Sequence, residues 1–319
     1  MYMLSIIIPN YNGKKYLKQC LDSIYHTDGL ISEVIIIDNA SEDDDFKWLD
    51  QYDSLYFKQL DRNYGFSRAV NEGIKLAQGE YVLLLNNDTV IEEGFLQELV
   101  KTIEKDKQIF SVSSKMIAYH QRDVIDDAGD AYNLLGWTKK RGDGQPITYF
   151  TQEERVFSAC AGAALYRKSI FNEIGYFDEH FFAYMEDVDI GYRANLYGYK
   201  NMYCPTAKVY HIGSATTGSR HNAFKVKLAA RNNLYMAYKN MPLCQLIIHF
   251  PFLAIGCFIK YLFFVRKGLG KAYRQGILEA LRSLGQLEKT PFRWKNFKYY
   301  MRVEYDLIKN LMLFFCNKG

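Results

Sequence analysis

The sequence predicts an α/β fold in which a mostly parallel central sheet is flanked by helices and followed by an α-helical appendage. Two observations support this prediction. Short β-rich runs alternate with amphipathic stretches through the first hundred residues, which is typical of βαβ units. Past about residue 222 the chain becomes basic and rich in apolar residues. We therefore expect one domain over residues 1–222 and a helical tail over residues 223–319.

The alternation places the first elements in order. Strands are expected at Leu4–Ile8, Glu33–Ile37, Leu55–Lys58 and Tyr81–Leu85, with helices at Lys15–Tyr25 and Ser67–Gln78. Later elements are a strand near Phe110–Met116, a short helix at Arg167–Ile174 and a helix from Glu186 through Tyr197. The stretch from about 107 to 155 is irregular and rich in glycine and charge, and it yields no further element.

Polar residues follow three of the expected strands. They are Pro9-Asn10-Tyr11-Asn12, Asp38-Asn39-Ala40-Ser41 and Asn86-Asn87-Asp88. Because ligands of open doubly wound sheets bind outside the carboxyl ends of the strands, these segments are the first candidates for a binding site.

The composition excludes several classes of protein. The 319 residues, 37.2 kDa, are 49% hydrophobic and 24% charged, too apolar for a disordered chain and too evenly charged for a multi-span membrane protein. Six cysteines form no CxxC pair, which favours a reduced cytoplasmic compartment and disfavours structural zinc. The first nine residues lack the basic start of a secretory signal, so export is not expected.

Charge divides the chain into two unlike parts. Residues 1–204 hold 21 Lys and Arg against 32 Asp and Glu, net −11, whereas residues 205–319 hold 19 against 4, net +15. A basic tail points to phosphates or anionic lipid, and a solvated basic face is the alternative.

One segment of the tail is strongly apolar. Cys244–Val265 has 17 apolar residues out of 22, but its uncharged part, Cys244–Ile259, is shorter than the roughly 20 residues that span a bilayer. With basic residues following it, we expect an interfacial or re-entrant helix, and a core helix of the appendage is the alternative.

Acidic residues mark two candidate sites. Asp88, with Asn86 and Asn87, follows a buried strand and is suited to a hard divalent cation that also grips a diphosphate; an ordinary turn is the alternative. Met185-Glu186-Asp187-Val188-Asp189 opens a helix, where carboxylates also serve as simple caps. One of them is suited to act as a general base toward a sugar hydroxyl.

A histidine completes the candidate metal site. His211 follows a strand-like stretch and precedes the small-residue segment Gly213–Gly218, with Arg220 behind it. This order fits a third metal ligand followed by a lid that closes over phosphate.

Four segments together resemble the inverting family 2 glycosyltransferases, which have the GT-A fold. They lie between about residues 4 and 215 and are Ile7–Asn12 with Asp38–Ser41, Asn63–Gly73, Leu84–Thr89, and Gly175–Glu179 running into Phe182–Asp189. Within that family the chain looks closest to bacterial rhamnosyltransferase-like enzymes of cell-surface polysaccharide synthesis.

The resemblance implies a role for each matching residue. Pro9, Tyr11 and Asp38 would contact the base and ribose of a nucleotide-sugar; Asn63, Gly65, Asn86 and Asn87 would line the donor site; Asp88 and His211 would hold Mg²⁺ or Mn²⁺; Asp187 would be the catalytic base; and Glu186, Asp189 and Arg193 would lie on the acceptor side or support the base. The chain departs from the family's DxD motif, because Asn86 stands where the first acid is expected.

The resulting hypothesis is inverting transfer of one sugar to a hydroxyl of a glycan acceptor. The preferred donor is dTDP-L-rhamnose, with a UDP-hexose as the alternative. The acceptor is expected to be linked to polyprenyl diphosphate, and the tail is expected to hold the enzyme on the anionic inner face of the cell membrane.

Other functions fit the sequence less well. A processive synthase would be expected to carry Gln-x-x-Arg-Trp, and Thr290-Pro291-Phe292-Arg293-Trp294 lacks the glutamine. A polyprenyl-phosphate sugar synthase would be expected to have two acids in its metal motif. A non-catalytic scaffold with a transferase fold remains as an alternative from another class. Nucleic acid is not an expected partner, because the basic residues of the tail alternate with apolar runs.

Overall fold

A central mixed sheet organises the protein. The computed structural model describes residues 4–27, 31–42, 45–213 and 222–316. The main path of the sheet follows the order β10-β12-β6-β11-β4-β1-β2-β3. Its strands are β1 (Leu4–Asn10), β2 (Ile31–Asp38), β3 (Leu55–Gln59), β4 (Tyr81–Leu85), β6 (Ile109–Ala118), β10 (Glu154–Val156), β11 (Ala163–Arg167) and β12 (Lys200–His211).

Strand direction brings the predicted polar segments to one edge. β1, β2, β3 and β4 are parallel, and β6 pairs in parallel with β12. β11 runs antiparallel to both β4 and β6, so the two groups of parallel strands point the same way. Four strands, β1, β2, β4 and β12, therefore have their carboxyl ends at one edge of the sheet. In the same order, these ends carry Asn10, Asp38, the Asn86 turn and His211.

Helices cover both faces of this sheet, as the alternation predicts. Ile6 and Ile8 of β1 face a core that includes α1 (Lys14–Tyr25) and α3 (Phe95–Ile103). Ile7 points to the other face, where α2 (Phe66–Leu76), α4 (Phe171–Ile174) and α5 (Glu186–Tyr197) pack. Successive strand residues point to opposite faces, so continuous apolar runs such as Ile6-Ile7-Ile8 are what a sheet covered on both sides requires.

The irregular stretch contains more structure than the sequence predicts. Within it, β7 (Ile125–Asp127) pairs with β6, and β8 (Asp130–Tyr132) forms a hairpin with β9 (Thr138–Lys140). Before it, a further short strand, β5 (Thr89–Ile91), pairs with β12. These strands have only three residues each, too few to show a two-residue periodicity.

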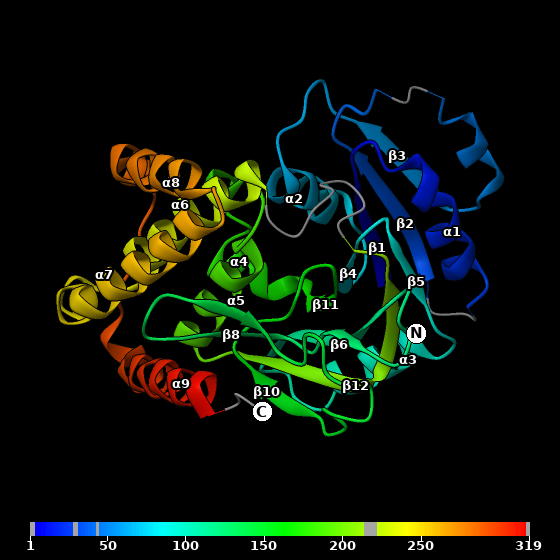
Figure 1. Cartoon of the computed structure of the whole chain (residues 1–319). Helices are drawn as coiled ribbons and strands as arrows, with labels where there is room; N and C mark the ends of the chain where they lie inside the picture. Colours follow the sequence, from blue (N-terminus) through cyan, green and yellow to red (C-terminus); the bar gives the residue numbers. More distant parts are fainter. Residues whose placement is uncertain (1–3, 28–30, 43–44, 214–221, 317–319) are drawn as a thin grey trace.

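The C-terminal helices gather on one side of the molecule, away from β1–β3 (Figure 1). They are α6 (Ala223–Asn240), α7 (Leu243–Arg266), α8 (Gly270–Ser283) and α9 (Phe297–Cys316). One buried cluster joins Tyr192 and Leu196 of α5 to Met236 of α6 and to Val303 and Leu307 of α9. The appendage therefore shares a hydrophobic core with the helix that carries the candidate base.

α7 is long and apolar enough to cross a membrane by length and composition. It has 24 residues, and 17% of its most apolar window is buried. The helix runs through Lys260 to Arg266, beyond the uncharged segment identified in the sequence. Because most of that window is exposed, α7 does not have the burial of a core helix.

Candidate active site at the carboxyl edge of the sheet

Asp38 ties together three segments at the edge of the sheet. The carboxylate is fully buried and accepts hydrogen bonds from Asn10 Nδ2 (2.7 Å), the Ser41 amide (2.8 Å) and Ser41 Oγ (2.6 Å). Asn87 Nδ2 in turn donates to Asn10 Oδ1 over 2.6 Å. Asp38 and Asn87 thus brace the loops after β1, β2 and β4, while Tyr11 lies partly exposed on the first of these loops.

Gly65, in the Asn63–Gly73 segment, lies against the loop that precedes α5. Gly65 has φ of +87°, and a Cβ atom there would lie 2.4 Å from the carbonyl oxygen of Phe182. Asn63 Oδ1 accepts from the Gly65 amide (2.9 Å), and Asn39 Nδ2 donates to the Gly65 carbonyl (3.0 Å). Only glycine combines this φ with so close an approach, so the Asn63–Gly65 turn is built to meet the Phe182 loop.

Asp88 and His211 meet, as a shared metal site requires. His211 Nε2 lies 3.3 Å from Asp88 Oδ1, and His211 Nδ1 lies 2.7 Å from Asp126 Oδ2. Burial opposes protonation of the imidazole, but the hydrogen bonds to Asp126 and Asp88 outweigh it and raise the pKa of His211 to about 9. Asp126, at the centre of β7, lies in the stretch that the sequence left without elements.

These residues fit a divalent cation. An imidazole nitrogen and a carboxylate oxygen, both mostly buried, are ligands that Mn²⁺ and Mg²⁺ accept, and Asp126 orients the imidazole through its other nitrogen. A cation held by His211 and Asp88 would replace the proton between them.

Asp187 lies at the N-terminus of α5 and is partly exposed. Its carboxylate accepts from the amides of Ala161 (3.3 Å) and Val188 (2.8 Å). Burial raises the pKa of Asp187 above its usual range, and these amides oppose the rise. A carboxylate with a raised pKa is a stronger base, which suits proton abstraction.

The loop between β10 and β11 connects the two parts of the site. The Ala161 amide donates to Asp187, while the Gly162 carbonyl accepts from the Asn86 amide over 2.8 Å. The candidate metal motif and the candidate base therefore contact adjacent residues of one loop.

Asp189 and Arg193 support α5 from within. Asp189 is fully buried and accepts from Arg193 (2.8 and 3.0 Å), Lys239 (3.0 Å) and Asn240 (2.7 Å). Arg193 also donates to the backbone carbonyls of residues 174–176. Of the two roles that the resemblance allows them, this geometry favours support of the base over contact with an acceptor.

The loop before α5 is strained and is held by α6. Phe182, Tyr184 and Met185 have φ of +64°, +70° and +71°, a region that bulky residues avoid. Asn232 of α6, itself fully buried, donates to the carbonyls of Phe181, Ala183 and Tyr184 at 2.7–3.0 Å. No sequence pattern signals this role, because single asparagines are common within helices.

One predicted feature cannot be placed. The expected lid after His211 falls largely on residues 214–221, which lie outside the described residues.

Comparison with known sequences gives a family and distant relatives. The family model described as Glycosyl transferase family 2 matches residues 5–175, more than half of the chain. The low-salt glycan biosynthesis hexosyltransferase Agl10 of Haloferax volcanii is 24% identical over 241 residues, which cover 72% of this chain and 73% of that protein. The poly-beta-1,6-N-acetyl-D-glucosamine synthase of Staphylococcus epidermidis is 24% identical over 224 residues, which cover 67% of this chain but only 51% of the synthase.

Solved structures show the same fold. GalNAc-T7, solved with UDP, GalNAc and Mn²⁺, has a TM-score of 0.60 at 19% identity over 72% of this chain and 47% of its own. The mannosyltransferase PcManGT of Pyrobaculum calidifontis, solved with GDP-Man and Mn²⁺, has a TM-score of 0.54 at 15% identity over 99% of this chain and 88% of its own. The expected α/β fold with C-terminal helices is confirmed.

Proposed function

Because the chain belongs to glycosyl transferase family 2, we propose that it transfers a single sugar from a nucleotide-sugar to a hydroxyl of a glycan, with inversion at the anomeric carbon. The observation that carries this proposal is that the Cys160–Gly162 loop contacts two candidate parts of the site. Gly162 accepts from the amide of Asn86, in the same motif as Asp88, and the Ala161 amide donates to Asp187.

The chemical step is a direct displacement. The acceptor hydroxyl oxygen bonds to the anomeric carbon while the bond from that carbon to the diphosphate oxygen breaks. Asp187 takes the hydroxyl proton, and the nucleoside diphosphate leaves with the bonding electrons. Attack from the face opposite the diphosphate inverts the configuration.

Asp88 and His211 would hold Mn²⁺ or Mg²⁺ at the diphosphate. When bound, the cation neutralises the charge that grows on the leaving group. Asp126 keeps the imidazole of His211 oriented, and the Asp38 network keeps the neighbouring loops in place.

Two donor classes follow from different observations. The motif resemblance favours dTDP-L-rhamnose. The structural neighbours solved with UDP and with GDP-Man support nucleoside-diphosphate sugars as the donor class. A UDP-hexose is therefore the second donor to test.

The C-terminal helices suggest where the enzyme acts. Exposed apolar side chains line α7, and the basic residues Arg266, Lys267, Lys271 and Arg274 follow. α7 is held to the body of the protein, since the Trp137 indole donates to the Gly256 carbonyl (3.1 Å) and the His249 Nε2 atom lies 2.8 Å from Glu304. An apolar helix fixed along its length suits insertion into the interface of an anionic membrane, from which a polyprenyl-diphosphate-linked acceptor is within reach.

Vesicle binding tests this location. Phe258, 60% exposed on α7, is changed to Asn, and Tyr149, 57% exposed outside the helices, is changed to Asn as a matched control. We expect Phe258→Asn to reduce cosedimentation with phosphatidylglycerol vesicles while the control binds like the parent. Equal binding by all three proteins would contradict docking through α7.

The transfer proposal is tested with Asp187→Asn. Release of nucleoside diphosphate is followed with each donor and a panel of methyl glycosides as acceptors. We expect the variant to lose activity by about 100-fold or more and to keep donor binding, because only proton removal is affected. Undiminished turnover by the variant would rule out Asp187 as the base.

A further inference from the structure

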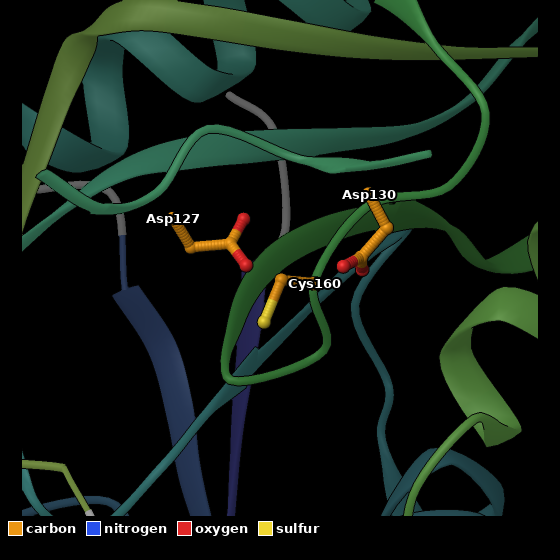
Figure 2. Close-up of side chains that lie close together, drawn as sticks. All are labelled: Asp127, Asp130 and Cys160. Atoms are coloured by element: carbon orange, nitrogen blue, oxygen red, sulfur yellow. The ribbon is translucent and has the colours of Figure 1, made fainter. Parts of the chain in front are cut away.

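A second group of side chains, Asp127, Asp130 and Cys160, lies beside the candidate base and has no part in the chemistry described so far. Asp127 and Asp130, at the two ends of the turn between β7 and β8, approach the thiol of Cys160 (Figure 2). The ligand atoms of the three residues lie within 4.8 Å of one another. Asp127 is fully buried and Asp130 is 7% exposed, whereas Cys160 is partly exposed.

One oxygen of this group lacks a partner. Asp127 Oδ1 accepts from the Gly129 amide over 2.6 Å, but within the part of the chain that the structure describes Oδ2 has no hydrogen-bond partner. Figure 2 shows the Asp127 carboxyl group turned toward Cys160 rather than away from the group. A buried carboxylate oxygen without a donor is costly, so its position points to a ligand that brings one.

A second unpartnered oxygen belongs to a neighbouring element. Glu186 at the start of α5 is 6% exposed, and its Oε2 atom likewise has no partner among the described residues. Glu186 precedes Asp187 in α5, and Asp187 contacts Ala161, the residue after Cys160. Carboxylates from two separate elements are therefore short of hydrogen-bond donors.

The backbone joins the group to the base. Asp130 pairs with Ser158 through its amide (3.0 Å), and from Ser158 the chain runs through Cys160 to Ala161, whose amide donates to Asp187. Asp127 and Asp130 thus flank the loop on which the base rests.

From this placement we propose that Asp127 and Asp130 form a hydroxyl-binding subsite for the acceptor sugar, with Glu186 beside them. The inference rests on the proposed function. In an inverting displacement the base contacts the acceptor, so hydroxyl-binding groups next to the base meet the acceptor ring rather than the nucleotide. A carboxyl group offers hydrogen-bond acceptor oxygens, and neighbouring hydroxyls of one ring supply the donors that Asp127 Oδ2 and Glu186 Oε2 lack.

A divalent cation is the competing occupant, and the surroundings disfavour it. A cation among these side chains would stabilise the ionised form of Asp187 and lower its pKa, which would weaken the base. The Asp88 and His211 pair already offers a cation site at the diphosphate end.

The test measures glycoside binding apart from turnover. The protein is saturated with Mn²⁺ and with whichever of UDP, dTDP or GDP raises its melting temperature. Saturation-transfer NMR then follows methyl glycosides of rhamnose, glucose, galactose, mannose and N-acetylglucosamine. The variants are Asp127→Asn and Asp130→Asn, with the exposed Asp123→Asn from the same region as the matched control.

We expect at least one glycoside to bind the parent and the control, and both subsite variants to bind it about tenfold more weakly, since an acceptor oxygen is replaced by an amide NH2 that cannot accept from a hydroxyl. Nucleotide binding should be unchanged in all four proteins. Unchanged glycoside binding in both variants, or no glycoside binding to a parent that binds nucleotide, would overturn the subsite alone. A parent stabilised by no nucleotide would overturn the proposed function and the subsite with it.

A metal titration tests whether a divalent cation occupies this group instead. Zn²⁺ and Mn²⁺ are titrated without nucleotide into the parent, Asp127→Asn and Cys160→Ser. We expect neither variant to change the number of ions bound. Loss of one bound ion in both would identify the group as a metal site and overturn the proposal.

Discussion

Asn232 provides the sharpest test of how the C-terminal helices serve the active site. Its side chain is fully buried in α6 and donates to three carbonyls of the strained loop before Asp187. Replacing it with alanine removes both amide hydrogens. The Phe181 carbonyl keeps Arg231 Nη2 as a donor, and the partly buried carbonyls of Ala183 and Tyr184 lose the Asn232 side chain. At about 1–2 kcal/mol for each lost bond, we expect a loss of about 2–4 kcal/mol in the free energy of unfolding.

This loss translates into a measurable shift of the melting temperature. The entropy of unfolding for a chain of 319 residues is about 0.7 kcal/mol/K, so the expected decrease is about 3–6 °C. The loop that positions Asp187 loses its anchor at the same time. We therefore expect turnover to fall further than the affinity for the donor.

Thermal unfolding and nucleoside-diphosphate release are measured side by side. The matched control is Asn310→Ala, which removes one hydrogen bond from α9 to the Tyr132 carbonyl at a partly exposed position. We expect a shift of about 1 °C and unchanged turnover for the control. If Asn232→Ala has the melting temperature and turnover of the control, the claim that α6 holds the loop before Asp187 is refuted.

Two further predictions concern pH and loop geometry. Burial opposes ionisation of Asp178, but Lys239 at 2.6 Å prevails and lowers the pKa of Asp178 to about 2. The folded state then binds fewer protons than the unfolded state, so Asp178 contributes about 2 kcal/mol above pH 4 that is lost as the pH falls toward 2. Thermal unfolding of Asp178→Asn between pH 6 and pH 3 should show a weaker pH dependence than that of the parent, and an equal dependence would contradict the pairing. Gly65→Ala should lower the melting temperature more than Gly144→Ala, because both have positive φ but only Gly65 would clash with Phe182; equal effects would show that the close approach is unimportant.

The sequence predicted the fold where apolar periodicity is long. β4 matches the expected Tyr81–Leu85, and α1 and α2 begin within one residue of their expected starts. Asp88 and His211 could be paired from the sequence because Asp88 follows a strand and His211 ends one, and strands that run the same way bring their carboxyl ends to one edge of a sheet. The fold class and the family follow from these long elements and their polar ends.

The residues that support the site could not be predicted from the sequence, and the reasons are physical. Asp126, Asp127 and Asp130 lie on three-residue strands whose pairing is set by distant neighbours rather than by local pattern. Asn232 acts through hydrogen bonds to backbone carbonyls some 50 residues earlier in the chain, and such contacts leave no local signature. Side chains with purely tertiary roles require the structure.

The measurement that most directly tests the central claim is the change in melting temperature on adding nucleotide-sugars. The parent and Asp88→Ala are titrated with dTDP-L-rhamnose, UDP-glucose, UDP-galactose, UDP-N-acetylglucosamine and GDP-mannose, each with and without Mn²⁺. A ligand that binds only the folded state must stabilise it. We predict that one nucleotide class stabilises the parent only when Mn²⁺ is present and does not stabilise Asp88→Ala. Absence of stabilisation by every donor, or equal stabilisation of both proteins, would contradict a metal-dependent nucleotide-sugar site at this edge of the sheet.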